Sequence, residues 1–143
     1  MLSWLFFFLL VYKQARPSVK HPNNKILILC NPHNPVGRVW RKTELGQMGA
    51  ICERHGVFVI ADEIHGDFAF PPQQYIPYLS VSESASQNAA ACISPAKIFN
   101  ISGMVDAIAI IPTETHRRQF HEFAHRHQIN KVWVFTDNAS ART

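Results

Sequence analysis

The stretch KILILCNPHNPVG, residues 25–37, joins a short apolar run to a proline-rich segment. The run Lys25–Cys30 follows turn-forming residues and predicts a strand buried on both faces, as in a parallel sheet. The segment Asn31–Gly37 predicts irregular backbone, because its two prolines lack N–H donors and disfavour helix in the residues before them. The carboxyl end of this strand therefore opens into a loop, which is where open α/β sheets bind their ligands.

The residues that follow predict a βαβ unit. Leu45, Met48 and Cys52 recur at helical spacing and predict an amphipathic helix over Thr43–His55, with Thr43 as its N-cap. Gly56 suits the position after a helix end. The apolar run Val57–Ala61 predicts a second buried strand. Strand, helix and strand within so short a stretch indicate a right-handed crossover in a parallel sheet.

Further elements extend this pattern toward the C-terminus. The runs Ala89–Ile93 and Ala107–Ile111 predict a third and a fourth strand, and a helix is expected over Thr113–Gln128. The long polar segment Phe68–Asn88 is expected to be functional or to carry short helical pieces. The sequence thus predicts an α/β fold with a mostly parallel sheet and flanking helices.

The composition limits the class of protein. The 143 residues suit a single domain, and a content of 47% hydrophobic and 17% charged residues excludes wholesale disorder, a collagen-like chain and a coiled coil. The formal net charge is +4, but the basic residues form no run interleaved with aromatics. We therefore expect no nucleic-acid partner.

The cysteines and the N-terminus bear on location. The three cysteines are an odd number without a CxxC pair, so they predict buried, reduced thiols in a cytoplasmic protein. The apolar run Met1–Tyr12 is shorter than the about 20 residues of a membrane span. Its nearest charges come after it, which is the reverse of a secretory signal. We expect no membrane association, and residues 1–24 form an apolar leader with no assigned role.

Chemically useful side chains follow three of the predicted strands. Asn34 comes after the first strand, Asp62 ends the second, and Ser94 and Lys97 follow the third. Singly, each residue also has an ordinary structural explanation as a turn residue, a helix cap or a surface charge. Because the carboxyl ends of parallel strands share one edge, we expect the amide, the carboxylate and the amine to face a single pocket.

Three motifs built on these residues resemble a known family. They are NPHNPVGRVW (31–40), ADEIHGDF (61–68) and SPAKIFNISG (94–103). They resemble the large domain of fold-type I pyridoxal-phosphate enzymes of the class I/II aminotransferase superfamily, and most closely its cystathionine β-lyase branch. The resemblance runs from about Lys25 to about Phe120. It implies a PLP-dependent transferase-like fold, pyridoxal 5'-phosphate as cofactor, an amino-acid substrate and a homodimer.

The resemblance also implies roles for individual residues. Lys97 matches the lysine that holds the cofactor and moves a proton in catalysis. Asp62 matches the carboxylate beside the pyridine nitrogen, and Asn34 matches the amide that donates to the ring's phenolic oxygen. Ser94 matches a hydroxyl that binds the cofactor phosphate. His65 stands where related enzymes often have a tyrosine near the same ring oxygen.

The length of the chain departs from the family. Members are more than twice as long, so we expect residues 25–112 to be the central part of the large domain, followed by a helix and an unassigned tail over 113–143. We expect a fragment of a carbon–sulfur β-lyase with weak retention of the cofactor. An aminotransferase on the same scaffold and a non-catalytic remnant are the alternatives.

A competing motif lies in the last predicted helix. His121, Glu122 and His125 match the HExxH pattern, in which two histidines bind zinc and the glutamate activates a water molecule. A third protein ligand is missing at the expected spacing, so a zinc hydrolase is a remote alternative. The ordinary explanation is the polar face of a helix, opposite Phe120 and Phe123.

Overall fold

The computed structural model describes residue 19 and residues 23–102, 107–129 and 133–135 of the chain. Its strands are β1 (Ile26–Cys30), β2 (Phe58–Asp62), β3 (Ala89–Ile93), β4 (Ile108–Ile110) and β5 (Trp133–Phe135). Its α-helices are α2 (Lys42–Arg54), α3 (Glu83–Gln87), α4 (Pro95–Ile98) and α5 (Glu114–Arg126). Two short 3-10 helices, η1 (Gly66–Phe68) and η2 (Tyr78–Ser80), complete the set. The segment Phe68–Asn88, which was expected to carry short helical pieces, contains η2 and α3, while η1 ends at its first residue.

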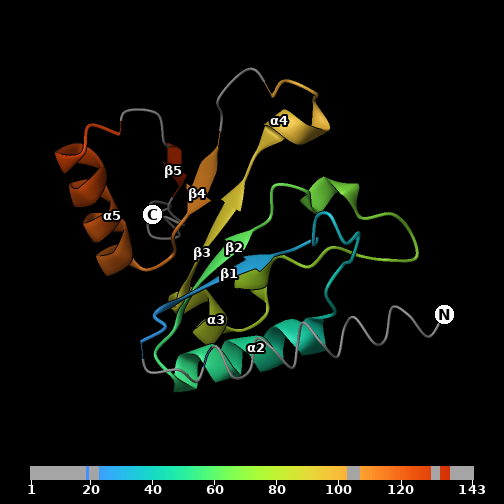
Figure 1. The fold of residues 1–143 in the computed structure, drawn as a ribbon, viewed down its shortest axis with the longest axis horizontal. Coiled ribbons are helices and arrows are strands. Elements are labelled where there is room, and N and C mark those ends of the chain that lie inside the picture. Colours follow the sequence, from blue (N-terminus) through green and yellow to red (C-terminus); the bar gives the residue numbers. More distant parts are fainter. Residues whose placement is uncertain (1–18, 20–22, 103–106, 130–132, 136–143) are drawn as a thin grey trace, which may run out of the picture.

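The five strands form one mixed sheet in the order β1-β2-β3-β4-β5 (Figure 1). β1, β2 and β3 are mutually parallel, β4 is antiparallel to β3, and β5 is parallel to β4. The α/β class, the parallel βαβ unit and the three predicted parallel strands are confirmed. The family resemblance also implies that the strand predicted over Ala107–Ile111 is antiparallel to its neighbour, and β4 agrees with this.

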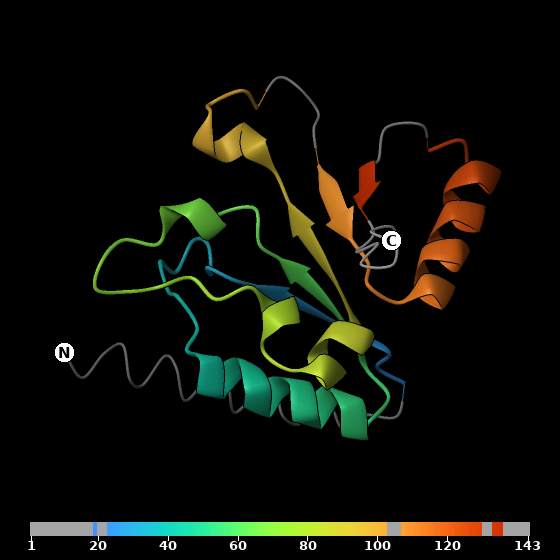
Figure 2. The same ribbon diagram turned by 180° about the vertical axis from the view of Figure 1, so that it is seen from behind.

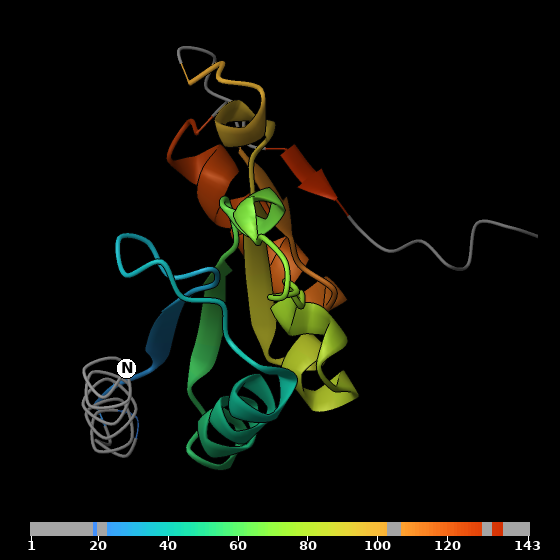
Figure 3. The ribbon, with the colours of Figure 1, turned by 90° about the vertical axis from the view of Figure 1, so that its right-hand side faces the viewer.

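Helices cover both faces of this sheet. α2 and α3 pack on one face, while α5 lies over the other, where the rings of His116 and Phe58 meet edge to face at 4.9 Å (Figures 2 and 3). The main core lies on the α2 side. Its buried residues are Val19, Leu29, Trp40, Leu45, Met48, Cys52, Val57, Val59, Ala61, Tyr78, Ala85, Ala89 and Ala91.

The start of α2 differs from the prediction. The helix begins at Lys42 with Arg41 as its N-cap, so the expected N-cap role of Thr43 is wrong. The reason is Glu44, whose carboxylate accepts a hydrogen bond from the backbone N–H of Arg41 at 3.0 Å. A side chain at the third helical position can thus close the helix start as effectively as a hydroxyl at the N-cap. Gly56 follows the helix with a φ of 62°, as predicted.

The C-terminal part departs in two places. Thr113 is the N-cap of α5 rather than its first residue, and Phe123, expected on the apolar side with Phe120, is 55% exposed. Ala124 is the buried residue of this helix. Strand β5 was not predicted at all, because three residues are too short a run to show a period.

Some expectations fall outside the described residues. These include almost all of the apolar leader over 1–24 and most of the tail over 130–143, so the proposed division of the chain stays a prediction. Among the described residues, the helices are too short or too polar to cross a membrane.

Candidate functional site at the carboxyl edge of the sheet

Asp62 lies at the centre of the edge where the three parallel strands end. Its sheet partners are Cys30 on β1 and Cys92 on β3. The backbone N–H of Asn31 donates to the carbonyl of Asp62 at 2.9 Å, and the N–H of Glu63 donates to the carbonyl of Cys92 at 2.8 Å. Because side chains alternate along a strand, Asp62, Cys30 and Cys92 share the sheet face opposite α2.

Asn34 lies in the segment that leaves β1, here called the Asn34 loop (residues 31–38). The N–H of His33 donates to the carbonyl of Arg38 at 2.7 Å, and the N–H of Gly37 donates back to His33 at 2.8 Å. Gly37 has a φ of 70°, a conformation that favours glycine. The thiol of Cys30 accepts from the N–H of Asn34 at 3.5 Å, and the Asn34 side chain is exposed. The peptide bonds before Pro32 and Pro35 are cis.

Lys97 and Ser94 lie beyond the end of β3, in and before the short helix α4 (Figures 1 and 2). Ser94 is the N-cap of α4, and its Oγ accepts a hydrogen bond from the N–H of Ala96 at 3.1 Å. Lys97 is exposed on the helix. Among the described residues, neither Lys97 nor Asp62 forms an ion pair. The amine and the carboxylate are therefore not committed to each other or to another side chain of opposite charge.

His65 is half-buried and caps the short helix η1, with its ring 6.1 Å from that of Phe68. It follows β2 on the same edge of the sheet as Asp62. The structure thus brings the predicted residues to one edge through three adjacent strands. A groove of about 670 Å³ nearby has a mostly apolar lining, whose polar residues are Glu63, Asp67, Tyr75, Ser80, Ser86 and Ser94. The lining does not include Asn34, Asp62 or Lys97. The single pocket expected for those three groups stays a prediction.

Glu63, which the sequence reading did not select, is buried next to Asp62. Its carboxylate accepts hydrogen bonds from the hydroxyl of Tyr75 at 2.7 Å, the N–H of Tyr78 at 2.7 Å and the Nδ2 of Asn31 at 3.3 Å. Burial raises the pKa of Glu63, while these hydrogen bonds oppose the rise. The alternation that buries Val59 and Ala61 continues to Glu63, so the strand period could have identified it.

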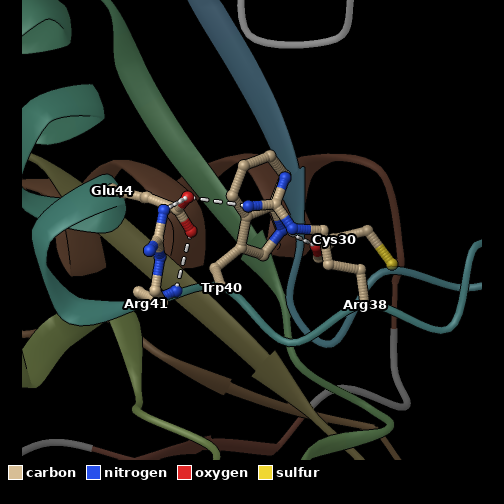
Figure 4. Close-up of polar contacts among 5 residues, drawn as sticks. All are labelled: Cys30, Arg38, Trp40, Arg41 and Glu44. Carbon is tan, nitrogen blue, oxygen red and sulfur yellow. Dashed lines mark hydrogen bonds and ion pairs between the residues drawn. The ribbon is translucent and has the colours of Figure 1, made fainter. Parts of the chain in front are cut away.

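Glu44 is the second buried carboxylate that was missed (Figure 4). Its Oε1 accepts from the guanidinium groups of Arg38 and Arg41, each at 2.8 Å. Arg38 lies over the ring of Trp40 at 4.3 Å, and the Nε1 of Trp40 donates to the carbonyl of Cys30 at 2.9 Å. Burial would raise the pKa of Glu44, but its hydrogen bonds and the charges of both arginines lower it overall.

The cysteines are free thiols, as predicted. The predicted burial is confirmed for Cys52 but is wrong for Cys30 and Cys92, which are half-buried because they end strands at the edge of the sheet. Burial raises the pKa of the Cys92 thiol, and the negative charges of Asp62 and Glu63 raise it further. The Cys92 thiol beside Asp62 therefore favours the neutral state.

The HExxH residues lie on the exposed surface of α5. His121, Glu122 and His125 are all exposed, and Glu122 pairs with Arg118 at 4.0 Å. In the part of the chain that the structure describes, no group of three or more His, Cys, Asp or Glu side chains could hold a metal ion. These observations favour the ordinary explanation of a polar helix face.

The mixed sheet with its flanking helices matches the pyridoxal-phosphate-dependent transferase-like fold of solved structures that cover most of this chain. The chain belongs to the aminotransferase class I and II family, whose model matches residues 10–138. This match extends further in both directions than the three motifs did. Members of the family use pyridoxal phosphate and act on amino-acid substrates.

Individual relatives carry related names. The chain is 33% identical over 128 residues to cystathionine beta-lyase PatB of Bacillus subtilis, covering 90% of this chain and 33% of that protein. Cystalysin from Treponema denticola, whose structure contains pyridoxal 5'-phosphate, superposes with a TM-score of 0.76 at 32% identity, over 88% of this chain and 31% of cystalysin. The PLP-bound C-S lyase from Staphylococcus hominis gives a TM-score of 0.72 at 32% identity, over 80% and 29%. The chain thus spans about a third of the length of these relatives.

Proposed function

We propose that this chain carries the cofactor-facing edge of a pyridoxal-phosphate-dependent carbon–sulfur β-lyase. The reaction would be β-elimination from cystathionine or another L-cysteine S-conjugate, giving pyruvate, ammonia and a thiol. The register that sets Asp62 between Cys30 and Cys92 supports the proposal, because the chain continues to Asn34 and Lys97 from the strands on either side. The names of the relatives favour a lyase.

The side chains at this edge suit the cofactor chemically. Lys97 would hold the cofactor through its primary amine, and the same amine would take the proton from the substrate α-carbon. Asp62 supplies a carboxylate that keeps the ring nitrogen protonated, and the Asn34 amide donates to the phenolic oxygen. When bound, pyridoxal phosphate supplies an electron sink conjugated to the substrate α-carbon.

Two further residues complete the proposed site. The hydroxyl of Ser94 would bind the cofactor phosphate, and His65 would face the phenolic oxygen of the ring. The family resemblance implies a homodimer, and we propose one for the whole protein. We also propose a cytoplasmic location, because the cysteines are free thiols.

Reductive trapping tests the proposal even when retention of the cofactor is weak. The full chain is mixed with pyridoxal phosphate, reduced with borohydride and digested, and the attached pyridoxyl groups are located by mass spectrometry. We expect labelling of Lys97 at cofactor concentrations that leave the exposed lysines Lys25 and Lys42 unlabelled. Replacement of Asp62 by Asn should weaken labelling of Lys97 about tenfold or more. Equal labelling of all three lysines would contradict the proposal and favour a non-catalytic remnant.

An aminotransferase is the second candidate, since the matching family model is that of aminotransferases. It would use the same cofactor residues. Substrate trials separate the two reactions: release of pyruvate and thiol from cystathionine without a keto-acid acceptor indicates the lyase. Dependence on a keto-acid acceptor indicates the transferase.

A further inference from the structure

The buried polar side chains of the described residues are concentrated around one loop. They are Asn31, Glu44 and Glu63, with exposures of 0%, 4% and 3%. Asn31 and Glu63 meet at the start of the Asn34 loop, and Glu44 holds its end at Arg38. We propose that Glu44 and Glu63 are positioning residues that fix the two ends of this loop and so set the place of Asn34. The inference rests on the proposed role of Asn34.

Glu63 fixes the first end. Its three hydrogen bonds join the end of β1 to Tyr75 and Tyr78, two residues from a distant part of the chain. The amide of Asn31 also donates to the carbonyl of Ile76 at 3.0 Å. Among the described residues, Glu63 has no cationic partner. A buried carboxylate is costly unless it is hydrogen-bonded, and an apolar side chain would fill the same space without that cost. Unlike an apolar side chain, the carboxylate links the end of β1 to the segment of Tyr75 and Tyr78 through its hydrogen bonds.

Glu44 fixes the second end from the first turn of α2. One carboxylate oxygen accepts from Arg38 and Arg41 together, which holds the last residue of the loop against the helix. Arg38 in turn covers Trp40, and Trp40 donates back to the carbonyl of Cys30 at the end of β1. The two ends of the loop are therefore tied to each other as well as to the body of the domain (Figure 4).

Asn34 itself is held through the backbone. Its side chain is exposed, while its N–H lies 3.5 Å from the thiol of Cys30, and that thiol also donates to the carbonyl of Pro32 at 3.3 Å. The hydrogen bonds between His33, Gly37 and Arg38 close the rest of the loop. With the backbone fixed at both ends, the point from which the Asn34 side chain extends toward a ligand is set.

The two carboxylates call for different variants. In Glu44→Gln the new NH2 group replaces one of the two carboxylate oxygens. It then faces either the backbone N–H of Arg41 or the guanidinium groups of Arg38 and Arg41, so two hydrogen-bond donors point at each other. In Glu63→Gln the amide oxygen still accepts from Tyr78 and Asn31, and the hydroxyl of Tyr75 turns to accept from the NH2 group. Glu63→Ala removes all three acceptor contacts. Glu53→Gln on the exposed side of α2 is the matched control.

Amide hydrogen exchange of the full chain tests the inference without cofactor. We expect the N–H groups of His33 and Gly37 to exchange at least tenfold faster in Glu44→Gln and in Glu63→Ala. Glu63→Gln and Glu53→Gln should stay within twofold of the wild type, as should the amide of Ile60 inside β2 in Glu44→Gln. Unchanged loop amides in Glu44→Gln, or equal acceleration at Ile60, would overturn the inference.

A second measurement asks whether the effect reaches the ligand through Asn34. Pyridoxyl labelling of Lys97 is compared in Glu44→Gln, Asn34→Ala and the double variant. We expect each single variant to lower labelling, and the double variant to be no worse than Asn34→Ala alone. Fully additive losses would show that Glu44 does not act through Asn34. If the wild type shows no preference for Lys97, the proposed function fails, while hydrogen exchange still decides how the loop is held.

Discussion

Two segments that leave the same edge of the sheet, one after β1 and one after β3, are held in opposite ways. The Asn34 loop after β1 is fixed by buried carboxylates, a buried tryptophan and a thiol. The segment after β3, which carries Lys97, is held by the Ser94 cap and by two backbone hydrogen bonds, from Phe99 to Pro95 and from Ile101 to Ala96. Residues 97–100 are exposed.

The contrast matches the roles proposed for the two groups. An amide that donates to a ring oxygen acts from one place, so contacts within the chain can fix it in advance. An amine that first holds the cofactor and later moves a proton needs room to change partners. The contacts of the described residues therefore determine the position of Asn34 more completely than that of Lys97.

The largest expected effect is at Trp40. Replacement by Ala removes a 4%-exposed ring and its hydrogen bond to Cys30, so the free energy of unfolding should fall by about 3–5 kcal/mol. Urea denaturation of the full chain measures it. A loss below about 1 kcal/mol would mean that the loop after β1 is no better held than α4, and the contrast would disappear.

Glu44→Gln should have the next largest effect, with a pH dependence. At neutral pH we expect a loss of about 1–3 kcal/mol in the free energy of unfolding, because buried donors lose their acceptor. The pKa of Glu44 in the folded protein lies below its ordinary value of 4.5, so its stabilisation is present above that pH and is lost as the pH falls through the folded pKa. The gap between wild type and variant should therefore narrow below pH 4.5. A gap that is constant from pH 7 to pH 3 would contradict this reading.

Ser94→Ala should have a smaller effect on the second segment. The variant removes the acceptor for the N–H of Ala96, and loss of an N-cap typically costs about 0.5–2 kcal/mol. Ser82→Ala, which removes the cap of α3, is the matched control. In thermal unfolding, Ser94→Ala should lower the melting temperature less than Trp40→Ala does. The reverse order would show that α4 is held more firmly than the Asn34 loop.

The smallest effect is expected at Phe99. This ring is 70% exposed, so Phe99→Ala should change the free energy of unfolding by no more than about 0.5 kcal/mol. A cost near that of Trp40→Ala would reveal contacts around α4 that the described residues do not supply. Both aromatic variants can be measured in the same denaturation series.

The elements that the sequence predicted best are those with a continuous local signal. The three parallel strands were placed within one residue, since an unbroken apolar run flanked by turn formers is visible in a short window. The start of α2 was missed because the capping contact comes from Glu44, three residues inside the helix, and a glutamate there is also common without such a role. Phe123 was misplaced because helical spacing does not show how much of α5 the sheet covers.

The candidate site divides in the same way. Asn34, Asp62 and Lys97 were selected by their position after strands and by the family resemblance, and the sheet register brings those strands together. Glu63 and Glu44 were missed because their importance lies in burial and in side-chain partners, such as Tyr75 and Arg38, that no local pattern pairs with them. Strand alternation alone could have indicated Glu63.

The pairing of Ile93 with Ile108 has a consequence for how this sheet can vary. The last residue of β3 is paired with the first residue of β4, so residues 94–107 connect two strand ends that lie side by side. Adding residues to this connection, or removing them, would leave the register of β3 and β4 unchanged. Doubling the length of the connection would cost only about 0.6 kcal/mol in closure entropy. Insertions and deletions in this connection could therefore change the position of Lys97 while the strands of the sheet stay in register.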